Sequence, residues 1–228
     1  MKSIKDIINQ HNLTSEYANN LVNNEHIFNE IYKECGYSFI PGDGSYLFEG
    51  SVYEYSEKMY PKQLLLYEIA KKSSSVLEIG VYMGHSLFIM LLANPYLNIT
   101  AIDIVDKYSL PAIKILKKYF PDSKIDFYHG DSLHILPNIK NNKFDFFHID
   151  GHHLEEHIKN EVFLCEKLSS NTKDNEILMK ILFDDVHCCQ GFINNIISKN
   201  KVLNFIKPDC IWANSYIEYI AENGDLKK

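Results

Sequence analysis

From residue 75 onward, short runs typical of β-strands alternate with segments whose apolar residues recur at helical spacing. The runs are Ser75–Ile79, Ile99–Asp103, Lys124–His129, Phe144–Asp150 and Met179–Asp184. Helical spacing is clearest over roughly residues 109–119 and 153–167. This alternation predicts βαβ units, and hence a three-layer α/β fold whose sheet is mostly parallel.

The C-terminal part of the chain departs from this alternation. Two β-rich runs, Val202–Ile206 and Tyr216–Ala221, are joined by a short connection that contains Lys207, Pro208 and Asp209. A connection this short has no room for a crossover helix. The pattern therefore predicts an antiparallel hairpin at one edge of the sheet.

The N-terminal part differs in composition from the rest of the chain. It is polar and aromatic, with a Gly/Pro-rich turn at Pro41–Gly44 and with Pro61 at the start of a predicted helix. We therefore divide the chain into an N-terminal helical cap or lid segment, residues 1–70, and a sheet domain, residues 71–228. The aromatic stretch Tyr37–Tyr60 is either a lid over an acceptor or a packed appendage that caps the sheet.

Composition narrows the range of partners. The 228 residues carry a formal charge of −7, and all 23 basic residues are lysines. Arginine is best suited to bidentate contacts with guanine and phosphate, so its absence from an acidic chain argues against a nucleic-acid reader.

No apolar run approaches the roughly 18–20 residues that span a bilayer. The five cysteines form no CxxC pair and the N-terminus lacks the pattern of a signal peptide, which together indicate a reduced, cytoplasmic protein.

Acidic residues lie at or near the end of each of the first five predicted strands. They are Glu78, Asp103, Asp131, Asp150 and Asp184. In an open α/β sheet, ligands bind outside the carboxyl ends of the strands. We therefore expect a binding site at that edge, the alternative being ordinary βα turns that carry acids by chance.

The glycines after the first strand suggest a cofactor. Val76–Ser86 reads E-x-G-x-x-x-G-x-S, which is not the G-x-G-x-x-G dinucleotide fingerprint. With Asp103 after the second strand and Gly130-Asp131-Ser132 after the third, it resembles motif I, the ribose acid and the adenine site of class I S-adenosylmethionine-dependent methyltransferases. The resemblance covers roughly residues 60–221 and implies a Rossmann-like methyltransferase sheet with S-adenosylmethionine as cofactor. The cofactor-binding residues that it implies are Glu78, Gly80, Tyr82, Gly84, Ser86, Asp103, Asp131 and Ser132.

A second group of polar residues ends the fourth and fifth strands, which are neighbours in this fold. Carboxylates brought close together repel each other unless a cation neutralises them, and oxygen ligands favour Mg²⁺, with Ca²⁺ or Mn²⁺ as alternatives. The patterns I-D-G-x-H and D-D resemble metal-dependent small-molecule O-methyltransferases, above all the branch of macrolide-sugar and antibiotic-tailoring enzymes. Catechol-type relatives carry Asn where this chain has Asp185. The resemblance implies Asp150, Asp184 and Asp185 as metal ligands and His153 as the base, with His152 as its rival.

These patterns predict metal-assisted methyl transfer to a hydroxyl of a small-molecule acceptor, of the sugar or phenol type. The alternative is a diverged or inactive methyltransferase fold that acts as a cofactor-binding or partner-binding module. A nucleic-acid methyltransferase is expected to show an N/D-P-P-Y motif after strand four, and this sequence has none there. A zinc pair of His153 and His157 and a soft-metal site at Cys188–Cys189 are weaker alternatives. Whether copies of the chain form a homo-oligomer is left open.

Overall fold

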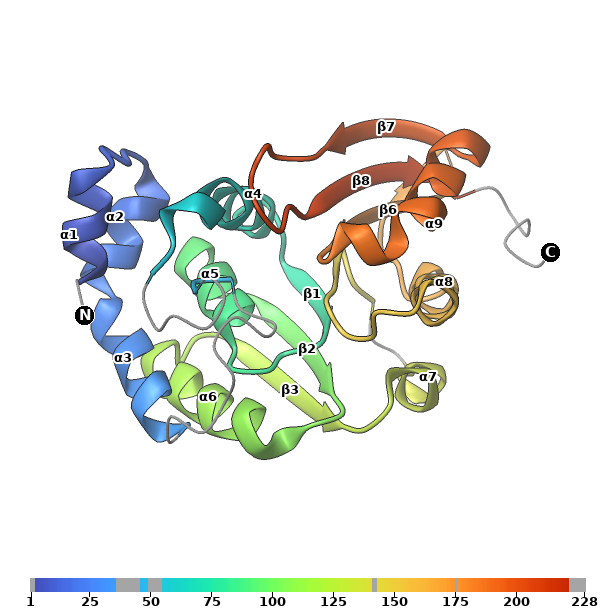
Figure 1. Cartoon of the computed structure of the whole chain (residues 1–228). Coiled ribbons are helices and arrows are strands. Elements are labelled where there is room, and N and C mark those ends of the chain that lie inside the picture. The colour runs from blue at the N-terminus through green and yellow to red at the C-terminus, as the bar shows by residue number, and fades with distance from the viewer. Residues whose placement is uncertain (1–2, 36–45, 49–54, 141–142, 175, 222–228) are drawn as a thin grey trace.

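The structure is a computed structural model that describes residues 3–35, 46–48, 55–140, 143–174 and 176–221 (Figure 1). The strands in the described part are β1 (Ser75–Ile79), β2 (Asn98–Asp103), β3 (Lys124–His129), β4 (Phe146–Ile149), β5 (Thr172–Lys173), β6 (Glu176–Phe183), β7 (Lys201–Ile206) and β8 (Ser215–Ile220). They form one sheet in the order β3-β2-β1-β4-β6-β8-β7, with β5 paired to β6 beside this path.

The pairing matches the predicted topology. Strands β3, β2, β1, β4 and β6 are parallel to one another. Strand β8 is antiparallel to β6, and β7 is antiparallel to β8, so the C-terminal hairpin lies at one edge of the sheet. The mostly parallel sheet and its edge hairpin are thereby confirmed. Strand β5 was not predicted, because a two-residue strand leaves no periodic pattern in the sequence.

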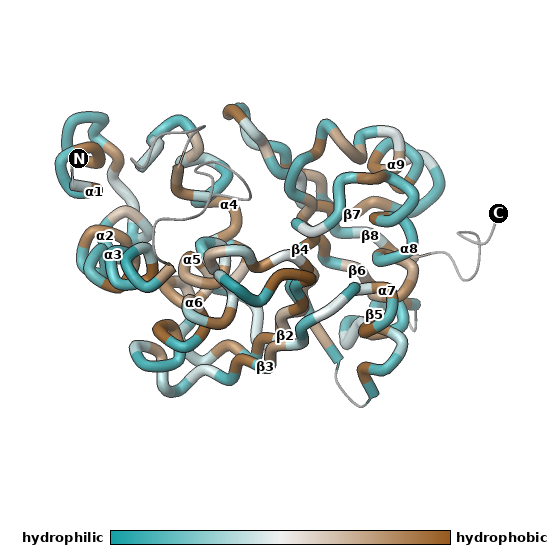
Figure 2. Tube along the Cα trace, turned by 60° about the horizontal axis from the view of Figure 1, so that its bottom comes forward, coloured by the Kyte–Doolittle hydropathy of each residue, from teal (hydrophilic) through white to brown (hydrophobic). Residues whose placement is uncertain are grey.

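Helices cover both faces of the sheet. They are α1 (Ile4–Gln10), α2 (Glu16–Asn23), α3 (Glu25–Glu34), α4 (Tyr60–Ala70), α5 (His85–Ala93), α6 (Asp106–Tyr119), α7 (Ser132–Ile135), α8 (Glu155–Glu166) and α9 (Val186–Lys199), with short 3₁₀ helices η1 (Glu57–Met59) and η2 (Leu136–Asn138). Helices α1 to α6 lie on one side of the central strands and α7 to α9 on the other (Figure 2). None of the described helices is long and apolar enough to cross a membrane.

Strand alternation decides which residues face which layer. In β1, Val76 belongs to the hydrophobic cluster on the side of α1 to α6, whereas Leu77 and Ile79 belong to the cluster on the side of α7 to α9. Successive side chains of a strand point to opposite faces. Glu78 therefore faces the same layer as Val76, which decides its role below.

The N-terminal helices pack into the same core as the sheet. Buried side chains of α1 to α3 share one cluster with α5, α6 and the sheet. Gln63 on α4 ties the segment together, because its Oε1 accepts hydrogen bonds from the Tyr17 and Tyr55 hydroxyls at 3.0 and 2.7 Å. The segment is thus a helical cap, while the division of the chain at residue 70 stays a prediction. The proposed turn at 41–44 and most of the aromatic stretch 37–60 lie outside the described residues.

Two element boundaries bear on function. Strand β6 ends at Phe183 and β4 at Ile149, so the acids that follow stand just beyond the strand ends. Helix α8 begins at Glu155 rather than near 153. His152 and His153 consequently lie in the turn between β4 and α8, outside the helix.

Candidate active site

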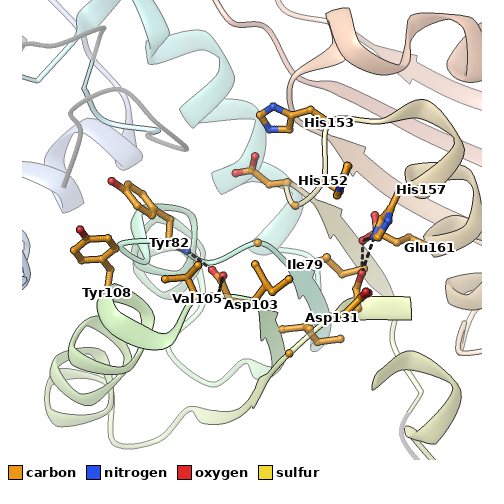
Figure 3. A pocket seen from close by; sticks show the side chains of 17 residues that line it. Ile79, Tyr82, Asp103, Val105, Tyr108, Asp131, His152, His153, His157 and Glu161 are labelled. Atoms are coloured by element: carbon orange, nitrogen blue, oxygen red, sulfur yellow. Dashed lines mark hydrogen bonds and ion pairs between the residues drawn. The ribbon is translucent and has the colours of Figure 1, made fainter. Parts of the chain in front are cut away.

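A cavity of about 570 Å³ opens at the carboxyl ends of strands β1 to β4 (Figure 3). This volume lies in the range typical of small-molecule and cofactor pockets. Its walls bring together residues that follow four different strands. They are Ile79, Gly80, Tyr82, Ile102, Asp103, Ile104, Val105, Tyr108, Gly130, Asp131, Ser132, Asp150, Gly151, His152, His153, His157 and Glu161.

Asp103 organises the loop after β1. Its Oδ2 accepts hydrogen bonds from the backbone N–H groups of Val81 and Tyr82 at 2.8 and 2.7 Å. The Ser109 hydroxyl donates to the same oxygen at 3.1 Å, and the Val105 N–H donates to Oδ1 at 2.8 Å. Tyr82 has φ 46°, a conformation that costs free energy for a non-glycine residue. The two loop bonds to Asp103 hold that conformation, and one acceptor position remains on Oδ1.

The two glycines of the motif lie at close contacts between elements. Gly80 has φ +88°, and a Cβ there would lie 2.0 Å from the Asp150 carbonyl oxygen. Gly84 has φ +68°, and its Cβ would lie 3.2 Å from that of Ala112 on α6. Gly80 therefore allows β1 and β4 to end against each other. A side chain at Gly80 would disturb that contact before it could meet a cofactor.

The pocket is closed at one end by Ser132, His157 and Glu161. The Ser132 hydroxyl lies 2.5 Å from Glu161 Oε1 and 3.2 Å from His157 Nε2. Burial raises the pKa of Glu161 to about 7, against the opposing hydrogen bond from Ser132. Glu161 Oε2 is buried and has no hydrogen-bond partner among the described residues. Asp131 caps α7 by accepting the Leu133 N–H at 2.8 Å.

Three predicted cofactor residues lie outside the walls of this cavity: Glu78, Gly84 and Ser86. Glu78 is fully buried on the face of the sheet that α1 to α6 cover. Its Oε1 lies 2.9 Å from His148 Nδ1. His148 Nε2 lies in turn 2.8 Å from the Tyr46 hydroxyl. Glu78 thus belongs to a buried polar chain under the N-terminal cap. Gly80, Tyr82, Asp103, Asp131 and Ser132 do line the cavity.

The acidic end of the site consists of Asp150, Asp184, Asp185 and His153. The structure departs here from the expected metal centre, because Lys62 Nζ lies 2.9 Å from both carboxylate oxygens of Asp184. The described residues contain no group of three or more His, Cys, Asp or Glu side chains placed to hold a metal ion. With Lys62 in place, the acids therefore adjoin one another without converging on a common point.

Asp150 is the acid that both cavities share, since it lines the large cavity and also a small one of about 10 Å³. Burial raises its pKa well above the usual range, and the negative charges of Asp184 and Asp185 act in the same direction. The positive charge of Lys62 opposes this shift. Asp184 and Asp185 line only the small cavity.

The two candidate bases are held differently. His153 Nε2 lies 3.0 Å from Asp185 Oδ2, which places the other ring nitrogen, Nδ1, away from that pair. His152 Nδ1 accepts the Leu154 N–H at 3.0 Å, and its ring stacks on His157 at 4.4 Å between centroids. A neutral His152 then carries its proton on Nε2 and has no free lone pair. The geometry favours His153 as a proton acceptor.

The alternative metal sites find no support in this arrangement. His153 faces Asp185, whereas His157 faces Ser132 and Glu161, so the two histidines do not form a pair. Cys189 is fully buried and Cys188 is partly exposed. Burial raises the pKa of the Cys189 thiol to about 12, which opposes the thiolate form that metals bind.

Lys62 and Glu161 were not among the predicted site residues. Both carried a signal in the sequence, because each is a charged residue on the apolar face of its helix. Lys62 shares the buried face of α4 with Leu66 and Ala70, at intervals of four residues. Glu161 lies between Ile158 and Val162 on the buried face of α8. A charge on such a stripe indicates a buried partner.

Comparison with known proteins places the chain in a family. The family model described as O-methyltransferase matches residues 49–164, which is about half of the chain. The chain belongs to the O-methyltransferase family. The expected class I S-adenosylmethionine-dependent methyltransferase family and fold are thereby confirmed. No curated protein sequence matches this O-methyltransferase.

Solved structures share the fold of this O-methyltransferase. The SAH-bound methyltransferase PaMTH1 of Podospora anserina is 14% identical, with a TM-score of 0.62 over 86% of this chain and 88% of that one. The O-methyltransferase of Bacillus cereus in complex with SAH is 16% identical, with a TM-score of 0.59 over 86% and 91%. The O-methyltransferase TomG of Streptomyces achromogenes, in complex with SAM, is 17% identical, with a TM-score of 0.55 over 71% and 80%.

Proposed function

We propose that this O-methyltransferase transfers the methyl group of S-adenosylmethionine to a hydroxyl of a small molecule. The observation that carries the proposal is that one cavity reaches from Asp103 and Ser132 to Asp150 and His153. Residues suited to hold a nucleoside and a residue suited to accept a proton therefore share one space. The solved relatives that contain SAH or SAM support the choice of cofactor.

Residues of this chain would hold the cofactor along the strand ends. Asp103 Oδ1 has one acceptor position left for a ribose hydroxyl. Glu161 Oε2, buried and without a partner among the described residues, lies with Ser132 at the end where an adenine amino group would be held. Gly80 and Tyr82 present the loop after β1 to the methionine part. When bound, S-adenosylmethionine supplies an electrophilic methyl group.

Asp185 and His153 form the proposed base. Asp185 follows β6 in the left-handed conformation, with φ 47°, which directs its carboxylate to His153 Nε2. The Nε2–H donates to Asp185, so the lone pair on Nδ1 is free to take the proton of the acceptor hydroxyl. His153 Nδ1 would take the hydroxyl proton as the acceptor oxygen bonds to the methyl carbon, while the bond between that carbon and the cofactor sulfur breaks and leaves S-adenosylhomocysteine. Asp185 is thus a positioning residue in this proposal rather than a metal ligand.

The predicted divalent metal does not fit the described arrangement of Asp150, Asp184 and Asp185. Both oxygens of Asp184 are paired with Lys62, and Asp185 faces His153. The cavity that the three acids share measures about 10 Å³, about the space of one water molecule. Mg²⁺ usually keeps several waters. No step of the proposed reaction therefore passes through a metal ion.

The exposure of the base decides how an acceptor can reach it. His153 is 61% exposed, so an acceptor hydroxyl can approach it from solvent. A sugar or phenol hydroxyl satisfies this requirement, and we propose these two classes as acceptors. Transfer of radiolabelled methyl groups to a panel of sugars and phenols, with calorimetry of S-adenosylhomocysteine binding, tests the proposal. Binding without transfer to any acceptor would favour the alternative of a cofactor-binding module.

A further inference from the structure

The geometry points to Lys62 as the resident cation of the acidic end, where it takes the place of the predicted divalent ion. We infer that methyl transfer by this chain needs no divalent metal. The role in transfer rests on the proposed function, whereas the role as a cation can be tested without it.

The acidic end brings several carboxylates close together and supplies one buried ammonium group. Lys62 Nζ bridges both oxygens of Asp184 at 2.9 Å. The side chains are only 2% and 5% exposed. The charge of Lys62 also acts on Asp150. Neutralisation of close carboxylates is the task that a metal ion was expected to perform.

Lys62 is held in place by more than its ion pair. Its ammonium group lies 4.1 Å from the centre of the Tyr46 ring, a cation–π contact. The Asn214 side chain donates a hydrogen bond to the Lys62 carbonyl oxygen at 3.2 Å. Tyr46 is itself fixed through its hydroxyl, which lies 2.8 Å from His148 Nε2. Lys62 is therefore a buried side chain fixed by several contacts, unlike a surface lysine paired with a single acid.

An ion could enter only if Lys62 left Asp184. The ammonium group would then lose its anion in a buried setting, which is strongly unfavourable. The small cavity of about 10 Å³ offers no room for a hydrated ion beside Lys62. Lysine and metal thus compete for the same carboxylate. Replacement of Lys62 by a neutral residue should turn the acidic end into an ion site.

Mn²⁺ is a suitable probe, because electron paramagnetic resonance counts its free form. The wild type, Lys62→Met and Lys72→Met are titrated with Mn²⁺, and their thermal unfolding is followed with and without the ion. Lys72 is an exposed residue just after the same helix, so Lys72→Met removes the same charge without touching the site. We expect the wild type and Lys72→Met to leave Mn²⁺ free. We expect Lys62→Met to bind one Mn²⁺ at least about tenfold more tightly than the wild type and to melt at a higher temperature with the ion.

Stoichiometric Mn²⁺ uptake by the wild type, lost in Asp184→Asn, would overturn the inference. A folded Lys62→Met that binds no Mn²⁺ would also overturn it. If Lys62→Met does not fold, Lys62→Gln replaces it, and the wild-type titration decides in either case. Calorimetry with S-adenosylhomocysteine is run on the same wild-type sample. Failure to bind S-adenosylhomocysteine would contradict the proposed function, whereas the Mn²⁺ result would remain valid.

Discussion

Two buried acids stand at different ends of the site, and the fold treats them in different ways. Asp184 lies at the acidic end and is paired with Lys62 through both oxygens. Glu161 lies at the end closed by Ser132, and its Oε1 is 3.3 Å from Nε2 of His157, a histidine whose pKa is lowered by burial. Burial raises the pKa of Glu161 to about 7; the negative charge of Asp131 acts in the same direction and the hydrogen bond from Ser132 opposes the shift.

The difference shows two ways in which the fold holds a buried carboxylate: Asp184 is paired with an ammonium group, and Glu161 has a raised pKa. A buried carboxylate is stabilised by an opposite charge or else tends to bind a proton. The acidic end, with Lys62 and the Asp185–His153 pair, is arranged for proton transfer. The Ser132–Glu161 end is arranged for hydrogen bonding to a polar ligand. We accordingly expect changes at the acidic end to affect turnover. Changes along the nucleoside wall, the side of the cavity with Asp103 and Ser132, should affect cofactor binding.

The largest expected effect tests the acidic end. His153→Ala should lower kcat by about 10²–10⁴, because it removes the proton acceptor. Affinity for S-adenosylhomocysteine should stay nearly unchanged, which calorimetry checks. His152→Ala is the matched control and should retain most of the turnover, since His152 Nδ1 already accepts the Leu154 N–H. Full activity of His153→Ala together with loss in His152→Ala would move the base by one residue.

The second effect concerns the nucleoside wall. Asp103→Asn should weaken S-adenosylhomocysteine binding about 10- to 100-fold, because it removes a charge-assisted hydrogen bond worth about 1.5–3 kcal/mol. The bonds from the Val81 and Tyr82 N–H groups would weaken as well. Calorimetry gives the affinity, and circular dichroism checks that the variant is folded. An unchanged Kd in a folded variant would remove Asp103 from the cofactor site.

The third effect is on the free energy of unfolding and tests the buried acid Glu161. Because the pKa of Glu161 is raised from 4.5 to about 7, the folded chain holds a proton that the unfolded chain releases between these values. The stabilisation is complete below the lower value and is lost as pH rises through the upper one. Glu161→Gln stays neutral, so its free energy of unfolding relative to the wild type should rise by about 2–3 kcal/mol between about pH 4.5 and about pH 8.

Denaturant unfolding across that pH range measures the difference. Glu156→Gln, an exposed glutamate on the same helix, is the control and should track the wild type. Burial also raises the pKa of Glu166 to about 7. Glu166 is present in every variant and therefore cancels from the comparison. A flat difference between Glu161→Gln and the wild type would mean that Glu161 is ionised in the folded chain.

Much of the fold could be predicted because strand and helix periodicity is local. The strands β1 and β3 were predicted to the residue, and Asp103, Asp150 and Asp184 were correctly placed at or just beyond strand ends. Glu78 lies outside the walls of the cavity, because strand alternation turns it to the opposite face from Ile79, and its role in cofactor binding stays a prediction. The motif spacing specifies a turn, but it does not specify the face of each side chain.

The pairing of Lys62 with Asp184 could not be predicted, because it joins residues 122 positions apart. Carboxylates at neighbouring strand ends require a cation on electrostatic grounds, but those grounds do not say which one. The choice depends on how α4 packs over the sheet, and no local pattern contains that information. The charge of Lys62 within the apolar stripe of α4 was the one available signal.

We expect the chain to hold a nucleoside cofactor in a site whose cation is its own lysine. Diffraction from crystals grown with S-adenosylhomocysteine and Mn²⁺, recorded at the manganese absorption edge, tests both parts at once. We expect S-adenosylhomocysteine between Asp103 and Ser132, Lys62 still on both oxygens of Asp184, and no anomalous peak at the acidic end. A manganese peak about 2.0–2.6 Å from Asp150 and Asp184, with Lys62 displaced, would contradict this expectation.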